Sequence, residues 1–163
     1  MVPIISVVGK SGAGKTTFLE KLVRELKRRG IRVAVIKHDT HGFDIDKPGK
    51  DTWRMAQAGS DAVVISSPFK MALVKTVDHD MTPDEIAVYL HGDVDLILTE
   101  GYKRGDKPKI EISRSEVSRE LLCTEDELVA LVTDQHFNMA VPQFGLEDVE
   151  GVASLLERDI LRR

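Results

Sequence analysis

The chain of 163 residues lacks several features that would place it in a specialised class of proteins. It has one cysteine, Cys123, so it can form neither an internal disulfide nor a Cys-x-x-Cys metal clasp. We therefore expect a protein of a reducing compartment, the cytoplasm. Basic residues are not in excess, because 23 Lys and Arg face 27 Asp and Glu and the net charge is −4. That balance disfavours the nucleic-acid backbone as a ligand, and we expect no nucleic-acid partner.

Long hydrophobic runs are also missing. The stretch from Val2 to Val8 is apolar, but Lys10 interrupts it well short of the roughly 20 residues of a membrane span. It has neither the basic region nor the small-residue cleavage site of a signal peptide. We interpret it as a buried strand and expect no association with a membrane. The composition, 42% hydrophobic and 31% charged, is typical of one globular domain over residues 1–163.

Strand and helix patterns alternate along the chain, which predicts an α/β fold with a doubly wound, mostly parallel sheet. The predicted strands of this sheet are residues 2–8, 31–37, 95–99, 109–113 and 128–133. The predicted helices are residues 15–29, 50–58, 82–91 and 146–161. Two further strands, 62–66 and 71–77, flank a turn at Pro68 and predict a β-hairpin insertion.

Residues Gly9 to Thr16 match the pattern G-x-x-x-x-G-K-[ST] at every fixed position. The motif lies between a predicted strand and a predicted helix, the context of the phosphate loop of a P-loop NTPase. In such a loop the backbone N–H groups surround phosphate oxygens, Lys15 reaches the β and γ phosphates, and the Thr16 hydroxyl binds Mg²⁺. The expected nucleotide-binding residues of this segment are Gly9, Ser11, Gly12, Ala13, Gly14, Lys15, Thr16 and Thr17.

Acidic residues follow three of the predicted strands. Asp39 and Glu100 come at the ends of strands 31–37 and 95–99, where ligands of doubly wound sheets lie. We expect both to act in catalysis and to bind Mg²⁺ together with Thr16; the alternative is a solvated loop carboxylate in each case. Asp134 follows strand 128–133 and could accept hydrogen bonds from N1–H and the 2-amino group of guanine. An aspartate of an ordinary turn is the alternative.

Two stretches are more specific to a single protein family than the phosphate loop is. Residues 44–51 read Asp-Ile-Asp-Lys-Pro-Gly-Lys-Asp, and residues 100–103 read Glu-Gly-Tyr-Lys. With the loop, they closely resemble the MobB family over about residues 2–112, whereas the last third is similar only in outline. The matching segments are Gly9–Thr17, Lys37–Asp39, Phe43–Asp51, Arg54, Ala58–Gly59, Asp95–Lys103 and Pro108–Glu111.

The resemblance implies a homodimeric GTP-binding protein with weak GTPase activity and with GTP and Mg²⁺ as cofactors. Such a protein assists the formation of the guanine dinucleotide of the molybdenum cofactor. Its implied partner is a guanylyltransferase of the MobA type, and molybdopterin is a second candidate ligand. The chain departs from other GTPases at the guanine motif, since Val132-Thr133-Asp134 replaces a full Asn-Lys-x-Asp.

Lys10 stands five residues before Lys15 in the loop. This placement resembles the signature lysine of dimeric P-loop ATPases, which contacts nucleotide across a two-fold interface. The resemblance implies a catalytic role in which Lys10 stabilises charge on the partner's phosphates, as an arginine finger does. The alternative is a lysine that projects into solvent.

Other functions stay open at this point. A small-molecule kinase would carry an arginine-rich lid, and Arg104, Arg114 and Arg119 are spread among acidic residues. A metal-insertion GTPase would need clustered Cys or His ligands, for which His38 and His41 are the nearest candidates. A third possibility is a module that binds GTP only to dock on an enzyme. The lysine-rich segments 41–51 and 102–109 would then flank the site and face a pterin phosphate or a docking protein.

Overall fold

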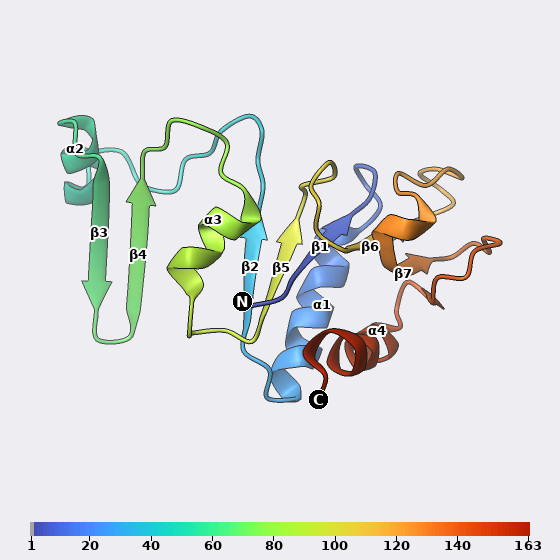
Figure 1. The fold of residues 1–163 in the computed structure, drawn as a ribbon. Coiled ribbons are helices and arrows are strands. Elements are labelled where there is room, and N and C mark those ends of the chain that lie inside the picture. The colour runs from blue at the N-terminus through green and yellow to red at the C-terminus, as the bar shows by residue number, and fades with distance from the viewer. Residues whose placement is uncertain (1) are drawn as a thin grey trace. The chain divides into compact units, whose positions relative to one another are not determined.

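The computed structural model describes residues 2–163 and divides them into two compact units (Figure 1). The larger unit combines the chain up to His38 with residues Thr82–Arg163, and the smaller unit is Asp39–Met81. The sequence predicted one domain with a hairpin insertion. The insertion forms a compact unit of its own because it supplies both a helix and a two-stranded sheet.

The larger unit is built on a six-stranded sheet with the order β2-β5-β1-β6-β7-β8. Every neighbouring pair is parallel, which confirms the doubly wound α/β fold. The strands are β1 (Ile4–Val8), β2 (Val33–Lys37), β5 (Leu96–Glu100), β6 (Lys109–Ser113), β7 (Leu128–Thr133) and β8 (Gln143–Phe144). The sequence did not predict β8, because a strand of two residues is too short to show a hydrophobic pattern.

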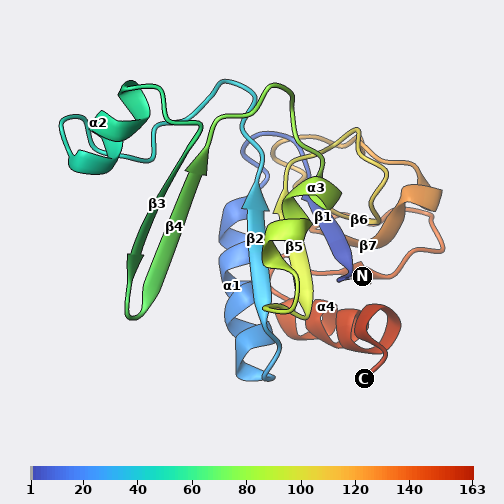
Figure 2. The ribbon, with the colours of Figure 1, turned by 60° about the vertical axis from the view of Figure 1, so that its left-hand side comes forward.

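Helices cover both faces of the sheet. On one face α1 (Lys15–Arg28) lies beside α4 (Val149–Leu155) and its continuation η3 (Leu156–Leu161), as Figures 1 and 2 show. Leu22 of α1 and Val152 of α4 share a buried cluster with Val7 and Leu98 of the sheet. The opposite face is covered by α3 (Pro83–Ala87) and the 3₁₀ turn η1 (Val88–Leu90), against which Ile97 packs. A second 3₁₀ turn, η2 (Glu125–Glu127), precedes β7.

Successive side chains of a strand point to opposite faces of the sheet and enter the two hydrophobic clusters in turn. Ile5 and Val7 of β1 belong to the cluster under α1, whereas Ile4 belongs to the cluster under α3. Because both faces are covered, β1 and β7 read as nearly continuous apolar runs, whereas β6 alternates apolar residues with the buried Lys109 and Glu111. The sequence predicted all strands of this sheet except β8, each within two residues of its observed bounds.

The smaller unit contains α2 (Asp51–Gln57) and the antiparallel hairpin of β3 (Ala62–Ser67) and β4 (Lys70–Lys75). The predicted hairpin is therefore confirmed, with the turn at Pro68 and Phe69. Its apolar side chains are unusually exposed: Phe69 by 99% and Met71 by 67%.

None of the helices in residues 2–163 is long and apolar enough to cross a membrane.

The carboxylate of Glu25 ties α1 to the C-terminal helices. It is buried and accepts hydrogen bonds from Arg28 and Arg29, and Arg29 also donates to Glu157 at 2.6 Å. These hydrogen bonds, first from Arg28 and then from Arg29, lower the pKa of Glu25 from 4.5 to about 2. Since α1 begins at the phosphate loop, this network also holds the helix that carries Lys15.

We predict that Glu25→Gln lowers the free energy of unfolding near neutral pH and reduces the further loss of stability in acid. Because the folded-state pKa of Glu25 is depressed, its carboxylate stabilises the fold above pH 4.5, and this contribution is lost as the pH falls towards 2. Urea unfolding near neutral pH and at about pH 3 measures both effects. The control is Glu20→Gln, an exposed carboxylate on α1 that lies 4.0 Å from Arg24. Equal behaviour of the two variants would contradict the prediction.

Candidate phosphate-binding site

The loop after β1 lies at the switch point of the sheet, where later strands are added on opposite sides of β1. From β1 the chain passes through α1 to β2 on one side, whereas β6 and β7 lie on the other side of β1. Ligands of doubly wound sheets bind at such a switch point, outside the carboxyl ends of the strands. The loop Gly9–Gly14 therefore occupies the position where this fold binds ligands.

Two glycines give the loop its shape. A Cβ on Gly9 would lie 2.4 Å from the carbonyl oxygen of Ile112, so only glycine allows the loop to pack against β6. Gly14 has φ 90° and stands at the N-cap of α1. Between them a turn is closed by Ala13, whose N–H donates to the Lys10 carbonyl at 3.2 Å.

The first turn of α1 carries the positive end of the helix dipole without a side-chain cap. Its N-cap, Gly14, has no side chain to accept from the free N–H groups, and the turn contains no acidic residue. The first N–H groups of a helix have no partner within it, so they are available to an anion. The phosphate loop thus ends in a helix terminus suited to negative charge.

Lys15 folds back along the loop. Its Nζ donates to the carbonyl oxygens of Gly9 at 3.1 Å and Lys10 at 3.0 Å. Burial lowers the pKa of Lys15, the positive charges of Lys103 and Lys37 lower it further, and the carboxylate of Glu100 opposes them. A phosphate at this position would relieve the repulsion among the lysines.

Thr16 and Glu100 come together at the rim of the loop. The Thr16 hydroxyl donates to Glu100 Oε1 at 2.8 Å, because Glu100 ends β5 and pairs in register with Val7 just before the loop. Hydroxyl and carboxylate oxygens are the ligands that Mg²⁺ prefers, and phosphate oxygens and waters usually complete its shell. The two side chains therefore fit the expected metal. Residues 2–163 contain no group of three or more His, Cys, Asp or Glu side chains that could hold a metal ion.

Asp39, the third predicted metal ligand, is the first residue of the smaller unit. Its Oδ1 accepts a hydrogen bond from the backbone N–H of His41 at 2.8 Å. The preceding residue, His38, stacks on Tyr102 with ring centroids 4.2 Å apart. Of the three predicted metal ligands the structure brings together Thr16 and Glu100, and the role of Asp39 stays a prediction.

Lys10 and Asp134 both contact the segment Arg114–Glu120. Lys10 Nζ donates to Ser118 Oγ at 2.6 Å and lies 4.0 Å from a carboxylate oxygen of Glu120. Asp134 accepts from the N–H of Ser115 at 2.7 Å and from its hydroxyl at 2.8 Å, which lowers the pKa of Asp134. Their predicted roles in catalysis and guanine recognition stay predictions. The segment itself is a neighbour of the loop that sequence reasoning missed.

The lysines predicted to flank the site differ in their environments. Lys103 is exposed, whereas Lys107 pairs with Asp84 at 2.5 Å. Lys109 is buried, only 2% exposed, and donates to Glu127 at 2.8 Å. Of these three, Lys103 is the lysine suited to an anionic ligand.

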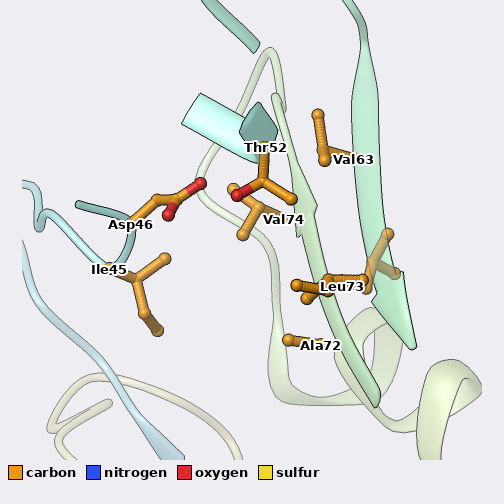
Figure 3. Close-up of a pocket in the computed structure, with 8 residues that line it drawn as sticks. Ile45, Asp46, Thr52, Val63, Ala72, Leu73 and Val74 are labelled. Carbon is orange, nitrogen blue, oxygen red and sulfur yellow. The ribbon is translucent and has the colours of Figure 1, made fainter. Parts of the chain in front are cut away.

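The smaller unit has a hollow of its own, of about 170 Å³, shown in Figure 3. Ile45, Asp46 and Thr52 face the hairpin residues across it. The hairpin side is apolar and is formed by Val63, Ile65, Ala72, Leu73 and Val74.

The family model described as Molybdopterin guanine dinucleotide synthesis protein B, MobB, matches residues 4–134. The chain belongs to the MobB family. The match covers β1 to β7 and therefore the phosphate loop, Glu100, the hairpin and Asp134. The family that the motifs resembled is thus confirmed.

Two relatives described as adapter proteins align over nearly the whole chain. The molybdopterin-guanine dinucleotide biosynthesis adapter protein of Escherichia coli (strain K12) is 35% identical over 166 residues, covering 96% of this chain and 92% of that protein. The protein with the same description from Haemophilus influenzae (strain ATCC 51907 / DSM 11121 / KW20 / Rd) is 34% identical over 157 residues, covering 96% and 88%.

Solved MobB structures share the fold. A crystal structure of molybdopterin-guanine biosynthesis protein B superposes with a TM-score of 0.75 at 28% identity, covering 98% of this chain and 99% of the other. The crystal structure of Bacillus subtilis MobB gives 0.72 at 26% identity, covering 94% and 97%.

Proposed function

We propose that the protein is a cytoplasmic GTP-binding adapter with weak GTPase activity, which assists the guanylyltransferase step of molybdopterin guanine dinucleotide biosynthesis. The observation that carries the nucleotide part is the phosphate loop with Thr16 Oγ1 at 2.8 Å from Glu100 Oε1. The pathway part rests on family membership and on relatives that are described as adapter proteins of this biosynthesis.

Different residues of the loop bind different parts of the Mg-nucleotide. The N–H groups of Gly12 and of Gly14 to Thr17 would bind the phosphate oxygens, and Lys15 would move from the carbonyls of Gly9 and Lys10 onto the phosphates. Thr16 and Glu100 would hold Mg²⁺, which neutralises phosphate charge when bound. We also assign to Glu100 the orientation of a water at the γ-phosphate.

Guanine recognition is assigned to Asp134 at the carboxyl end of β7. Its carboxylate can accept from N1–H and the 2-amino group of guanine, a donor pair that adenine lacks. Both of its oxygens already bond to Ser115, so a base would share these oxygens with Ser115 or displace it. A preference for GTP over ATP is the expected consequence.

The adapter role needs a surface for the partner enzyme. We assign docking of a MobA-type guanylyltransferase, or of the phosphate of molybdopterin, to the exposed Lys103 near Lys15. The exposed Lys47 and Lys50 are separate candidates within the smaller unit. Lys103 lies close enough to lower the pKa of Lys15, so an anion bound there would also change the charge of the nucleotide site.

A second copy of the chain is the proposed partner of the hairpin. Within residues 2–163 the sheet of β3 and β4 has no further strand, and a two-stranded sheet alone is marginally stable in water. Val64 and Met71, on one face of the hairpin, and Phe69 at its turn are more than half exposed. Exposed apolar patches of this kind mark protein interfaces, and a homodimer would bury them.

Calorimetric titration tests the nucleotide part directly. We predict that wild-type protein binds Mg-GTP more tightly than Mg-ATP and that Lys15→Ala weakens GTP binding roughly 100-fold, through lost charge-assisted hydrogen bonds. The control is Lys27→Ala, an exposed lysine at the other end of α1, which should bind GTP like the wild type. Unchanged GTP affinity of the Lys15→Ala protein would refute the proposed site.

Analytical ultracentrifugation, which gives the mass of the species in solution, tests the proposed dimer. We predict that Val64→Asp converts a two-chain species into a monomer, because a carboxylate would be buried in an apolar contact. Val88→Asp makes the same change at a valine of η1 that is 73% exposed, and it should leave the dimer intact. A wild-type monomer, or equal effects of both variants, would exclude the hairpin as the interface.

A further inference from the structure

The segment that follows β6 runs directly beside the phosphate loop. β6 pairs with β1 up to the match of Val8 with Glu111, so the residues after Ser113 leave the sheet at the same edge as the loop. The two segments approach closely, since a Cβ on Gly12 would lie 4.0 Å from Val117 Cγ2. The loop therefore has a wall made of residues distant in sequence.

Arg114 is the first residue of this wall. Its Nη2 lies 3.5 Å from the position of a Cβ on Gly14, the N-cap of α1. Its Nε is buried and has no hydrogen-bond partner among residues 2–163. A guanidinium next to a helix N-terminus meets unfavourable charge, and a buried donor without a partner is costly. Both costs would be relieved by an anion between Arg114 and the loop.

The wall is held in place from two directions. Asp134 binds the N–H and hydroxyl of Ser115, and Gln135 Nε2 donates to the Ser118 carbonyl at 3.0 Å. From the loop, Lys10 Nζ donates to Ser118 Oγ at 2.6 Å. These contacts fix the residues on the C-terminal side of Arg114 and leave its own Nε without a partner.

We infer that Arg114 is a phosphate-binding residue, supplied by the same chain and donating to the phosphate oxygens of the nucleotide opposite Lys15. The inference rests on the proposed function and extends it: in the ligand-free protein Lys10 and Asp134 also hold the arginine-bearing segment, through Ser118 and Ser115. Arginine suits this place because its planar fork offers paired donors to phosphate.

The test compares affinity with stability. Arg114→Ala is expected to weaken Mg-GTP and inorganic tripolyphosphate about 10- to 100-fold in calorimetric titration, the loss of one or two hydrogen bonds to a charged group. The melting temperature of the ligand-free protein is expected to stay the same or rise, since a buried unpaired donor is removed. Arg114→Lys should recover part of the affinity. Arg119→Ala, at an exposed arginine of the same segment, should change neither quantity.

The outcomes separate the role of Arg114 from the proposed function. If Arg114→Ala binds both probes like the wild type, the inference is wrong and the proposed function stands. If the wild type binds tripolyphosphate through Arg114 but shows no preference for GTP, the inference stands and the guanine assignment fails. A wild type that binds neither probe overturns both. If Arg114→Ala lowers both the affinity and the melting temperature, and Arg114→Lys does not recover the affinity, Arg114 has a purely structural role.

Discussion

The close contact of Gly9 with the Ile112 carbonyl is the constraint on which the rest of the site depends. A Cβ at Gly9 would lie 2.4 Å from that oxygen, so the loop can pack against β6 only with glycine there. The packing fixes where the loop turns into α1 and therefore where Lys15 and Thr16 point. It also brings the residues after β6 alongside the loop, which places Arg114 next to Gly14.

Polar groups at this edge of the sheet have two different functions. Thr16 and Glu100 bond to each other and keep oxygen atoms that a metal ion can share. Asp134 and Lys10 instead hold Ser115 and Ser118, and so shape the wall beside the loop. A residue at a strand end can thus reach a ligand directly or act by fixing a neighbour that does so.

Much of this arrangement could be predicted from the sequence, because strand ends of a parallel sheet meet at one edge. That rule placed the loop that carries Thr16 beside Glu100, and buried apolar residues revealed the strands of the larger unit apart from β8. It could not show that Asp134 would bond to Ser115, since this depends on a loop conformation that no periodicity encodes. Arg114 directly follows the strand predicted at 109–113, so the same rule applied to cations would have singled it out. The hairpin was predicted, but its formation of a separate unit with α2 was not, because hydrophobic pattern does not report which elements share a core.

Amide chemical shifts of ¹⁵N-labelled protein, recorded on addition of Mg-GTP, test most directly whether the loop after β1 is a nucleotide site. Binding at this loop predicts that the largest changes fall on residues 9–17, with further changes at Glu100 and in the segment Arg114–Glu120. Changes confined to the hollow of the smaller unit, around Ile45 and Thr52, or no changes at all, would contradict it.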